Sequence, residues 1–428
     1  MISQTCQRLL SSALLALVVA SRGQSTDSAI EQLKTLQEEL RKSHAKNDWH
    51  LNLTSAVRQK DLLNGAPDSL LEIARAQLHL GESDRAFDQL EQVAEMGQSE
   101  DLIAISPDFS ALLKHPHWTK LQNAFAANRI PVSLARTAFP LSDPALLAED
   151  VDYDPGSGRF FITSVREKKI ISASRTGSSI DFAAAPDNWP ILAIKVDSRR
   201  SVVWATEVAV QGFSLAPKAD WGRSAVLCFD LKNGRLMRRI EGPRGSALGD
   251  MALAANGDVI VSDGDGGAVY RASPTGGELT RLDDGDFISP QTPAIDPDGR
   301  HIFVPDYVRG IAVLELGTKK VRWLPMEGRF ALNGIDGMYF EGGKLIAVQN
   351  GTSPERVVIF TLDAQRRKIT SEKIIERSTP TLGDPTHGVI VDGDFFYIAN
   401  SGWDSIDDHG NIKPGVKLSV PRLMRVRP

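Results

Sequence analysis

The architecture follows from a pattern that is clearest in the run Asp336-Gly-Met-Tyr-Phe-Glu341-Gly-Gly-Lys-Leu-Ile-Ala-Val348. A polar residue leads a short apolar stretch, a turn with Glu341 and two glycines follows, and a second apolar stretch comes after the turn. Short apolar stretches separated by acidic residues and glycine are typical of antiparallel strands joined by a tight turn. The run therefore predicts a β-hairpin.

The same pattern occurs six times along the chain. Its leading residues are Glu149, Leu192, Asp250, Gln291, Asp336 and His387. Five of these stand five positions before their turn residue, whereas Asp250 stands six before Asn256. Repeats of roughly 40–50 residues, each holding four strands, are typical of β-propellers. We therefore expect residues 141–428 to form an all-β six-bladed propeller, because a sandwich of hairpins predicts no common register.

A different pattern precedes the strands, with apolar residues at helical spacing such as Ile30, Leu33 and Leu36. Residues 68–93 resemble one tetratricopeptide repeat. The matching positions are Leu70, Ala74, Gly81, Ala86, Leu90 and Val93. This resemblance implies an all-α, tetratricopeptide-like domain over residues 27–130, of a kind that binds a protein partner or packs on a neighbouring part of the protein. The expected fold class is therefore multidomain, with helical hairpins followed by the propeller.

The first 23 residues are expected to be a signal peptide. Arg8 precedes a largely apolar run from Leu9 to Ala20, and small or polar residues follow it. This layout is typical of secretory signals, and the run is too short to span a membrane. We expect cleavage between about residues 20 and 25 and a secreted or periplasmic protein. A buried N-terminal helix is the alternative. If Cys6 is removed with the signal, Cys228 remains alone and forms no intrachain disulfide.

Composition argues against two classes of protein. The formal net charge is −5, from 49 basic and 54 acidic residues, which argues against a nucleic-acid partner. Hydrophobic residues make up 42% of the chain and charged residues 24%, the ordinary composition of a globular protein and not of a disordered one. We therefore expect a globular protein that binds no nucleic acid. Since the apolar run near the N-terminus is too short to span a membrane, we also expect that the protein is not membrane-spanning.

The six leading residues carry the functional prediction. In a propeller the innermost strand of each blade lines the central channel, so the residues before those strands converge at one mouth. The expected ring holds three carboxylates, an amide and an imidazole, and crowded carboxylates raise each other's pKa. A hard cation such as Ca²⁺, which accepts carboxylate and amide oxygens, removes that repulsion. The alternative is that these residues merely cap strand ends in solvated loops.

Over residues 145–402 the sequence resembles the gluconolactonase, senescence-marker and paraoxonase type of six-bladed calcium propeller. Glu149 matches the metal-binding Glu of the family's first blade, and Asp336-Gly-Met matches its Asp-Gly-Met motif. Two positions depart from the family. Asp250 falls on an Asn-Asp motif whose Asn is here Gly249, and Gln291 or Thr292 falls where the family has a metal-binding Asn.

The resemblance implies a calcium site held by Glu149, Gln291 and Asp336. In such enzymes the metal polarises the carbonyl of a lactone or a phosphoryl oxygen, and an acidic residue activates water. Asp250 is the expected base, and His387 is a second catalytic candidate because its ordinary pKa suits proton transfer. The expected function is a calcium-dependent hydrolase of a lactone or related ester. The alternative is a non-catalytic binding or scaffolding protein that uses the helical and propeller surfaces.

Overall fold

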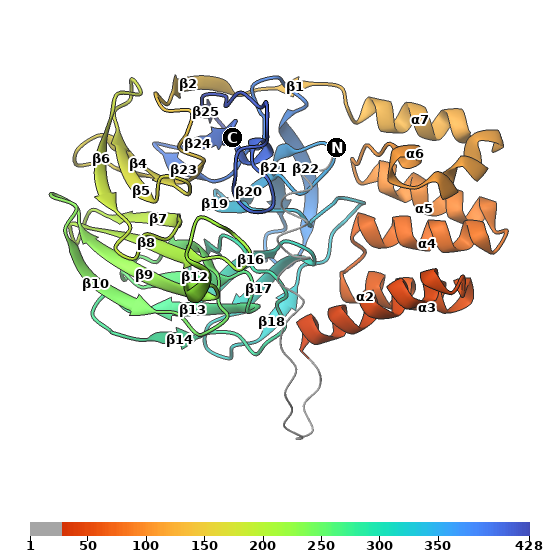
Figure 1. The fold of residues 1–428 in the computed structure, drawn as a ribbon, viewed down its shortest axis with the longest axis horizontal. Helices are drawn as coiled ribbons and strands as arrows, with labels where there is room; N and C mark the ends of the chain where they lie inside the picture. The colour runs from red at the N-terminus through yellow and green to blue at the C-terminus, as the bar shows by residue number, and fades with distance from the viewer. Residues whose placement is uncertain (1–27) are drawn as a thin grey trace.

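A computed structural model describes residues 28–428 and places a stack of helices beside a ring of sheets (Figure 1). The expected signal peptide and its cleavage point lie outside these residues. We call the helical part, residues 29–127, the helical array. Its elements are α2 (Ala29–Ala45), α3 (Trp49–Leu62), α4 (Pro67–His79), α5 (Ser83–Glu95), α6 (Leu102–Ile105), a 3₁₀ helix (Pro107–Lys114) and α7 (Trp118–Ala127).

The helical array forms because small residues let amphipathic helices cross closely. Ala74 on α4 and Ala86 on α5 are fully buried at the centre of this pair. Gly81 joins the two helices with φ of +79°, a left-handed conformation that favours glycine. Leu90 and Val93 complete the same buried cluster. Within residues 28–428, no helix is long and apolar enough to cross a membrane.

Six antiparallel sheets follow the helices, which confirms the predicted propeller. The first sheet contains β3 (Ala148–Asp154), β4 (Arg159–Ser164), β5 (Lys169–Ala173) and β6 (Ser179–Ala184). The second contains β7 (Ile191–Asp197), β8 (Val202–Ala209), β9 (Arg223–Asp230) and β10 (Leu236–Glu241). The third contains β11 (Leu248–Leu253), β12 (Val259–Asp263), β13 (Ala268–Ala272) and β14 (Leu279–Arg281).

The other three sheets complete the ring. The fourth contains β15 (Ala294–Ile295), β16 (His301–Asp306), β17 (Gly310–Glu315) and β18 (Val321–Trp323). The fifth contains β19 (Gly337–Glu341), β20 (Lys344–Gln349), β21 (Arg356–Leu362) and β22 (Ile369–Arg377). The sixth contains β23 (Gly388–Val391), β24 (Asp394–Ala399) and β25 (Arg422–Val426). The first strand of each blade contacts the first strand of the next, and β23 contacts β3, so the ring is closed.

Two strands from the segment after the helices are built into these sheets. Strand β2 (Arg136–Pro140) pairs with β25 as the fourth strand of blade six, and β1 (Val132–Ser133) adds a fifth strand to blade five. Both strands precede residue 141, the propeller start expected from the sequence. The propeller therefore includes residues before its expected start. The last blade has only three strands of its own, so β2, from the chain before blade one, supplies its fourth and outermost strand.

Apolar side chains fill the spaces between neighbouring blades. Phe139 of β2, Phe160 of β4 and Phe396 of β24 pack together and join blade six to blade one. Cys228 lies on β9, is 2% exposed, and belongs to the cluster between blades two and three. Burial raises the pKa of its thiol.

Candidate functional site

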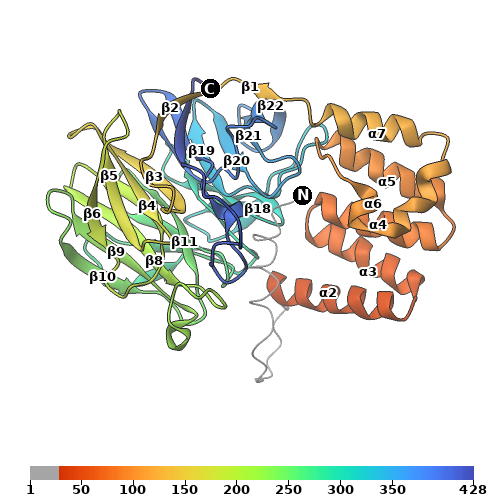
Figure 2. The ribbon, with the colours of Figure 1, turned by 45° about the horizontal axis from the view of Figure 1, so that its top comes forward.

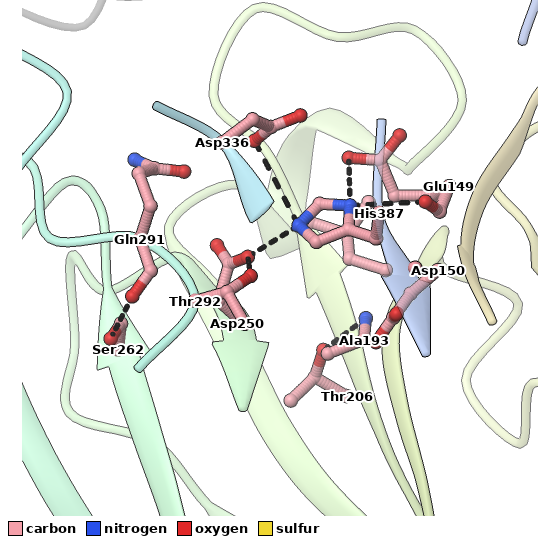
Figure 3. A network of polar contacts seen from close by, with 12 residues as sticks. Glu149, Asp150, Ala193, Thr206, Asp250, Ser262, Gln291, Thr292, Asp336 and His387 are labelled. Atoms are coloured by element: carbon pink, nitrogen blue, oxygen red, sulfur yellow. Dashed lines mark hydrogen bonds and ion pairs between the residues drawn. The ribbon is translucent and has the colours of Figure 1, made fainter. Parts of the chain in front are cut away.

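Figure 2 shows the ring of sheets beside the helices, turned by 45° from the view of Figure 1. Five of the six leading residues of the repeated pattern lie close together in Figure 3, and the sixth, Leu192, lines the cavity at the same mouth of the channel. All six stand within the first three residues of the innermost strands or up to three residues before them, so closure of the ring makes them converge. Five of the six line a cavity of about 170 Å³ at this mouth. These five are Glu149, Leu192, Asp250, Gln291 and Asp336. The sixth, His387, contacts three residues of the ring.

His387 lies at the centre of the acidic side chains (Figure 3). Its Nε2 atom is 2.6 Å from Oδ1 of Asp250 and 3.8 Å from Oδ1 of Asp336. Its Nδ1 atom is 3.0 Å from the carbonyl oxygen of Glu149 and 3.9 Å from Oε1 of that residue. A carbonyl oxygen only accepts, so Nδ1 carries a proton. His387 is 2% exposed, which keeps water from replacing these contacts.

The crowding changes the acidity of Glu149, Asp336 and His387. Burial, followed by the Asp336 charge, raises the pKa of Glu149 to about 8. Burial raises the pKa of Asp336 to about 6, although the nearby imidazole opposes this shift. Burial lowers the pKa of His387, but the carboxylates of Asp336 and Asp250 outweigh it and hold that pKa well above its ordinary value.

Each acid of the cluster is oriented by one further hydrogen bond. The indole Nε1 of Trp403 donates to Oε2 of Glu149 over 2.5 Å. Thr292 Oγ1 donates to Oδ1 of Asp250 over 2.6 Å. Asn350 Nδ2 donates to Oδ2 of Asp336 over 2.7 Å. Thr292 neighbours a predicted site residue, whereas Asn350 and Trp403 lie outside the repeated register, so the sequence pattern does not mark them.

Gln291 reaches the same cavity but does not join the cluster. Its amide nitrogen donates to the main-chain and hydroxyl oxygens of Ser289 over 3.2 and 3.1 Å. In Figure 3 no drawn interaction links its amide to His387 or to the acids. Asp150, which follows Glu149, also has a separate role, since Lys195 Nζ pairs with its Oδ2 atom at 2.7 Å.

The chemistry of the donors fits a bound dication. Ligand atoms of Glu149, Asp336 and His387 all lie within 4.8 Å of one another. Carboxylate oxygens suit Ca²⁺, whereas an imidazole nitrogen is a ligand of transition metals such as Zn²⁺. Because Nε2 of His387 already contacts Asp250, the oxygens of Glu149 and Asp336 are the donors that remain for calcium.

The walls of the cavity are largely apolar and its charges are of one sign. The apolar wall consists of Val165, Pro190, Leu192, Val210, Phe213 and Trp403. The lining includes five carboxylates, among them Asp265 and Asp384, and no Lys or Arg from the described part of the chain. Asp384 also forms a second acidic group with Glu355 and Asp404, whose ligand atoms lie within 4.8 Å of one another.

Comparison with known proteins yields similar folds only. No protein-family model and no curated protein sequence matches the chain. Among solved structures, a gluconolactonase from Xanthomonas campestris is 15% identical with a TM-score of 0.47, over 71% of this chain and 93% of that one. An aldose sugar dehydrogenase from Streptomyces coelicolor, solved with PQQ bound, is 14% identical with a TM-score of 0.46, over 69% and 97%.

A streptogramin B lyase gives similar values, with 15% identity and a TM-score of 0.46 over 68% of this chain and 96% of that one. These three proteins have different activities by their own descriptions. Likeness at this level describes the fold and assigns no activity to this chain.

Proposed function

We propose that the channel mouth is the active site of a hydrolase that uses a bound dication, calcium in the first instance, to open a lactone or cleave a related ester. The observation that carries this proposal is the 2.6 Å contact between Asp250 and His387. His387 lies beside Glu149 and Asp336, and these two acids line one cavity with Asp250. A base paired with an imidazole, next to two further acids and an apolar wall, is a set suited to acyl transfer to water.

Each residue has a separate task in this proposal. Glu149 and Asp336 hold the cation, which supplies Lewis acidity to the substrate carbonyl when bound. Asp250 and His387 act as a pair: Asp250 takes the proton of the attacking water, and the pair returns a proton to the leaving alkoxide. Nδ1 of His387 stays fixed on the carbonyl oxygen of Glu149, so the exchangeable proton is confined to Nε2.

The apolar wall binds the body of the substrate and excludes water from the reacting atoms. Phe213 and Trp403 stack with their ring centroids 6.0 Å apart on one side of the cavity, and Leu192 lies in the same apolar group. Water adds to the carbonyl carbon, the carbon–oxygen ester bond breaks, and the alkoxide takes up the proton. A small, mostly apolar cavity with polar groups at one end favours this division of tasks.

Metal analysis combined with a substrate panel tests this function. The purified protein is assayed for bound calcium, zinc and manganese, and then with δ-valerolactone, gluconolactone and p-nitrophenyl acetate, with and without chelator. We expect hydrolysis of at least one substrate, its loss in chelator and its return with added calcium. Asp250→Asn is the matched variant, because it keeps the side-chain shape and removes the base.

A non-catalytic binding protein is the second candidate, and one observation favours it. The helical array, whose α4–α5 pair we propose to be tetratricopeptide-like, exposes apolar side chains. These are Leu51, Val57, Ile103, Ile105 and Leu113. Absence of turnover across the panel would favour this candidate.

We also propose export of the mature protein. Mass spectrometry of the N-terminus tests it, and an intact Met1 on exported protein would contradict cleavage.

A further inference from the structure

The helical array holds segments of the propeller that carry cavity-lining residues. We call residues 286–289, 306–309 and 350–353 the rim segments, because they contain Ser289, Tyr307 and Asn350 of the cavity wall. Ile288 is buried in a cluster with four residues of the array, and Val308 packs against the same cluster. The four residues of the array are Ala29, Leu33, Leu63 and Ala66. Two rim segments therefore lack a complete apolar core without the helices.

Hydrogen bonds join the array to the rim segments at two further points. Asn64 Nδ2 donates to the carbonyl oxygen of Arg309 over 3.0 Å. The Ser99 amide donates to the Ser353 carbonyl over 2.5 Å, and the Ser353 hydroxyl donates back to the Ser99 carbonyl over 2.9 Å. The Ser353 amide also donates to Oε1 of Gln98 over 3.2 Å. All three rim segments are thus attached to the array.

A buried arginine ties the array to the strand that precedes Asn350. Arg356 is fully buried, and its Nε donates to Oε1 of Gln349 over 2.7 Å. Its guanidinium also reaches the carbonyl oxygen of Met96, at 3.5 Å. A side chain at Gly97 would place its Cβ 2.5 Å from Nη1 of Arg356, so only glycine allows this approach. Gln349 and its neighbour Asn350 are therefore fixed from the helical side.

From the rim segments a short chain of hydrogen bonds leads into the acidic cluster. The Tyr307 hydroxyl donates to Oδ1 of Asn350 over 3.1 Å, and Nδ2 of Asn350 donates to Oδ2 of Asp336 over 2.7 Å. The reverse orientation of the amide would turn its oxygen toward the Asp336 carboxylate, which cannot donate when ionised. Each of the three residues exposes less than a tenth of its surface, which limits the competition of water for these bonds.

We propose that Tyr307 and Asn350 are positioning residues for Asp336, and that the helical array keeps them in place through the rim segments. The inference rests on the proposed function, because it assigns a role at the same site. The helical array then helps to position the residues of the active site. Asn350 holds one carboxylate oxygen of Asp336, so that the other oxygen stays directed at the cluster, and Tyr307 acts through Asn350 by holding the oxygen of its amide.

Tyr307→Phe tests the first half of the proposal, since it removes only the hydroxyl. A crystal structure of the variant should show the Asn350 amide rotated and the Asp336 carboxylate displaced from its position near His387. With p-nitrophenyl acetate we expect kcat to fall ~10–100-fold with KM within about twofold. Tyr270→Phe on blade three is the matched control and should behave as wild type.

An unmoved Asp336 in Tyr307→Phe would overturn the positioning role, whatever the kinetics. If wild-type protein hydrolyses none of the panel while Asp336 still moves in the variant, the proposed function fails and the positioning role stands. Asn350→Asp adds a second check. It keeps the shape but replaces the donor with a like charge beside Asp336, and should displace that carboxylate at least as far.

Leu63→Ala tests the second half, the role of the array. In Leu63→Ala, hydrogen–deuterium exchange should rise in residues 286–289 and 306–309. The kcat of this variant should fall, as it does in Tyr307→Phe. Leu40→Ala is the matched control, because Leu40 is buried among helical residues only. Leu63→Met should restore both readouts, since it conserves volume. Unchanged exchange at the rim segments in Leu63→Ala would overturn this role.

Discussion

The Nε2 atom of His387 lies 2.6 Å from Oδ1 of Asp250, although the two residues are 137 positions apart in the chain. His387 begins blade six and Asp250 belongs to blade three, and these blades face each other across the ring. The imidazole therefore crosses the channel between opposite blades. Glu149 of blade one and Asp336 of blade five flank it, so four blades must be correctly closed before the cluster exists.

Removal of the imidazole should destabilise the protein strongly. His387→Gln leaves the acids of the cluster buried without a cationic partner, and such changes typically cost about 3–5 kcal/mol. Urea denaturation at neutral pH, with chelator present, measures the loss. His301→Gln is the control, since His301 pairs with Asp298 near the surface. A loss below about 1 kcal/mol would show that the pairing contributes little.

A dication should stabilise the folded protein through Glu149 and Asp336. At calcium about a hundredfold above its dissociation constant, we expect a gain of ~2.7 kcal/mol and a higher Tm. Asp336→Ala should abolish the calcium-dependent gain, because it removes one of two oxygen donors. Asp181→Ala, an exposed acid paired with Lys169, should keep it. A wild-type Tm that no added cation raises would argue for the binding-protein alternative.

Glu355 should make stability depend on pH. Burial, followed by the charge of Asp404, raises the pKa of Glu355 to about 8, and Asp384 also faces it. Between pH 4.5 and 8 the folded protein keeps a proton that the unfolded chain has lost, so stability falls as pH rises through this window.

Glu355→Gln should flatten that dependence, since the amide does not titrate. Thermal melts at half-unit steps from pH 5 to 8 check this, with the exposed Glu341→Gln as control. Parallel curves for wild type and Glu355→Gln would contradict the assignment.

The segment between the helices and blade one should resist proteases. Pro131 and Pro140 interrupt the sequence pattern, which predicts a first cleavage near residues 130–145, between a helical part and a propeller that are separately compact. In the structure, residues 132–133 and 136–140 are hydrogen-bonded into blades five and six. We now expect limited proteolysis to spare these strands. An early cut there that releases a stable propeller would show that the strands add little to the ring.

Phe139 should contribute much of the stability of ring closure. Phe139 is 4% exposed, and its ring centroid lies 5.4 Å from that of Phe160, between blades six and one. Phe139→Ala should cost about 3–5 kcal/mol in chemical denaturation, because it leaves a cavity in this cluster. Phe182→Ala, at the partly buried edge of blade one, should cost less. Equal losses of stability in Phe139→Ala and Phe182→Ala would show that the contact between blades six and one stabilises the fold no more than the contact at the edge of blade one.

Much of the fold could be predicted from the sequence, because its signals are local. Apolar stretches with turns at a fixed offset predict hairpins, and six copies in register predict six blades. The register also predicted which residues meet at the mouth, since equivalent positions in a closed ring converge. Glu149, Asp250, Asp336 and His387 are brought together as that argument expects. The strands β1 and β2 were not predicted, because their pairing partners lie more than two hundred residues away.

The sequence by itself determined the repeat, the blade number and the acidic character of the mouth, since each depends on spacing and residue type. Only the tertiary structure decided which contacts those residues make. His387 occupies the centre of the cluster, Gln291 turns to Ser289, and Asn350 and Trp403 bind acids from outside the register. These contacts depend on side-chain orientation and on loops of different length. Neither is encoded in a local pattern, because both are settled when distant segments pack together.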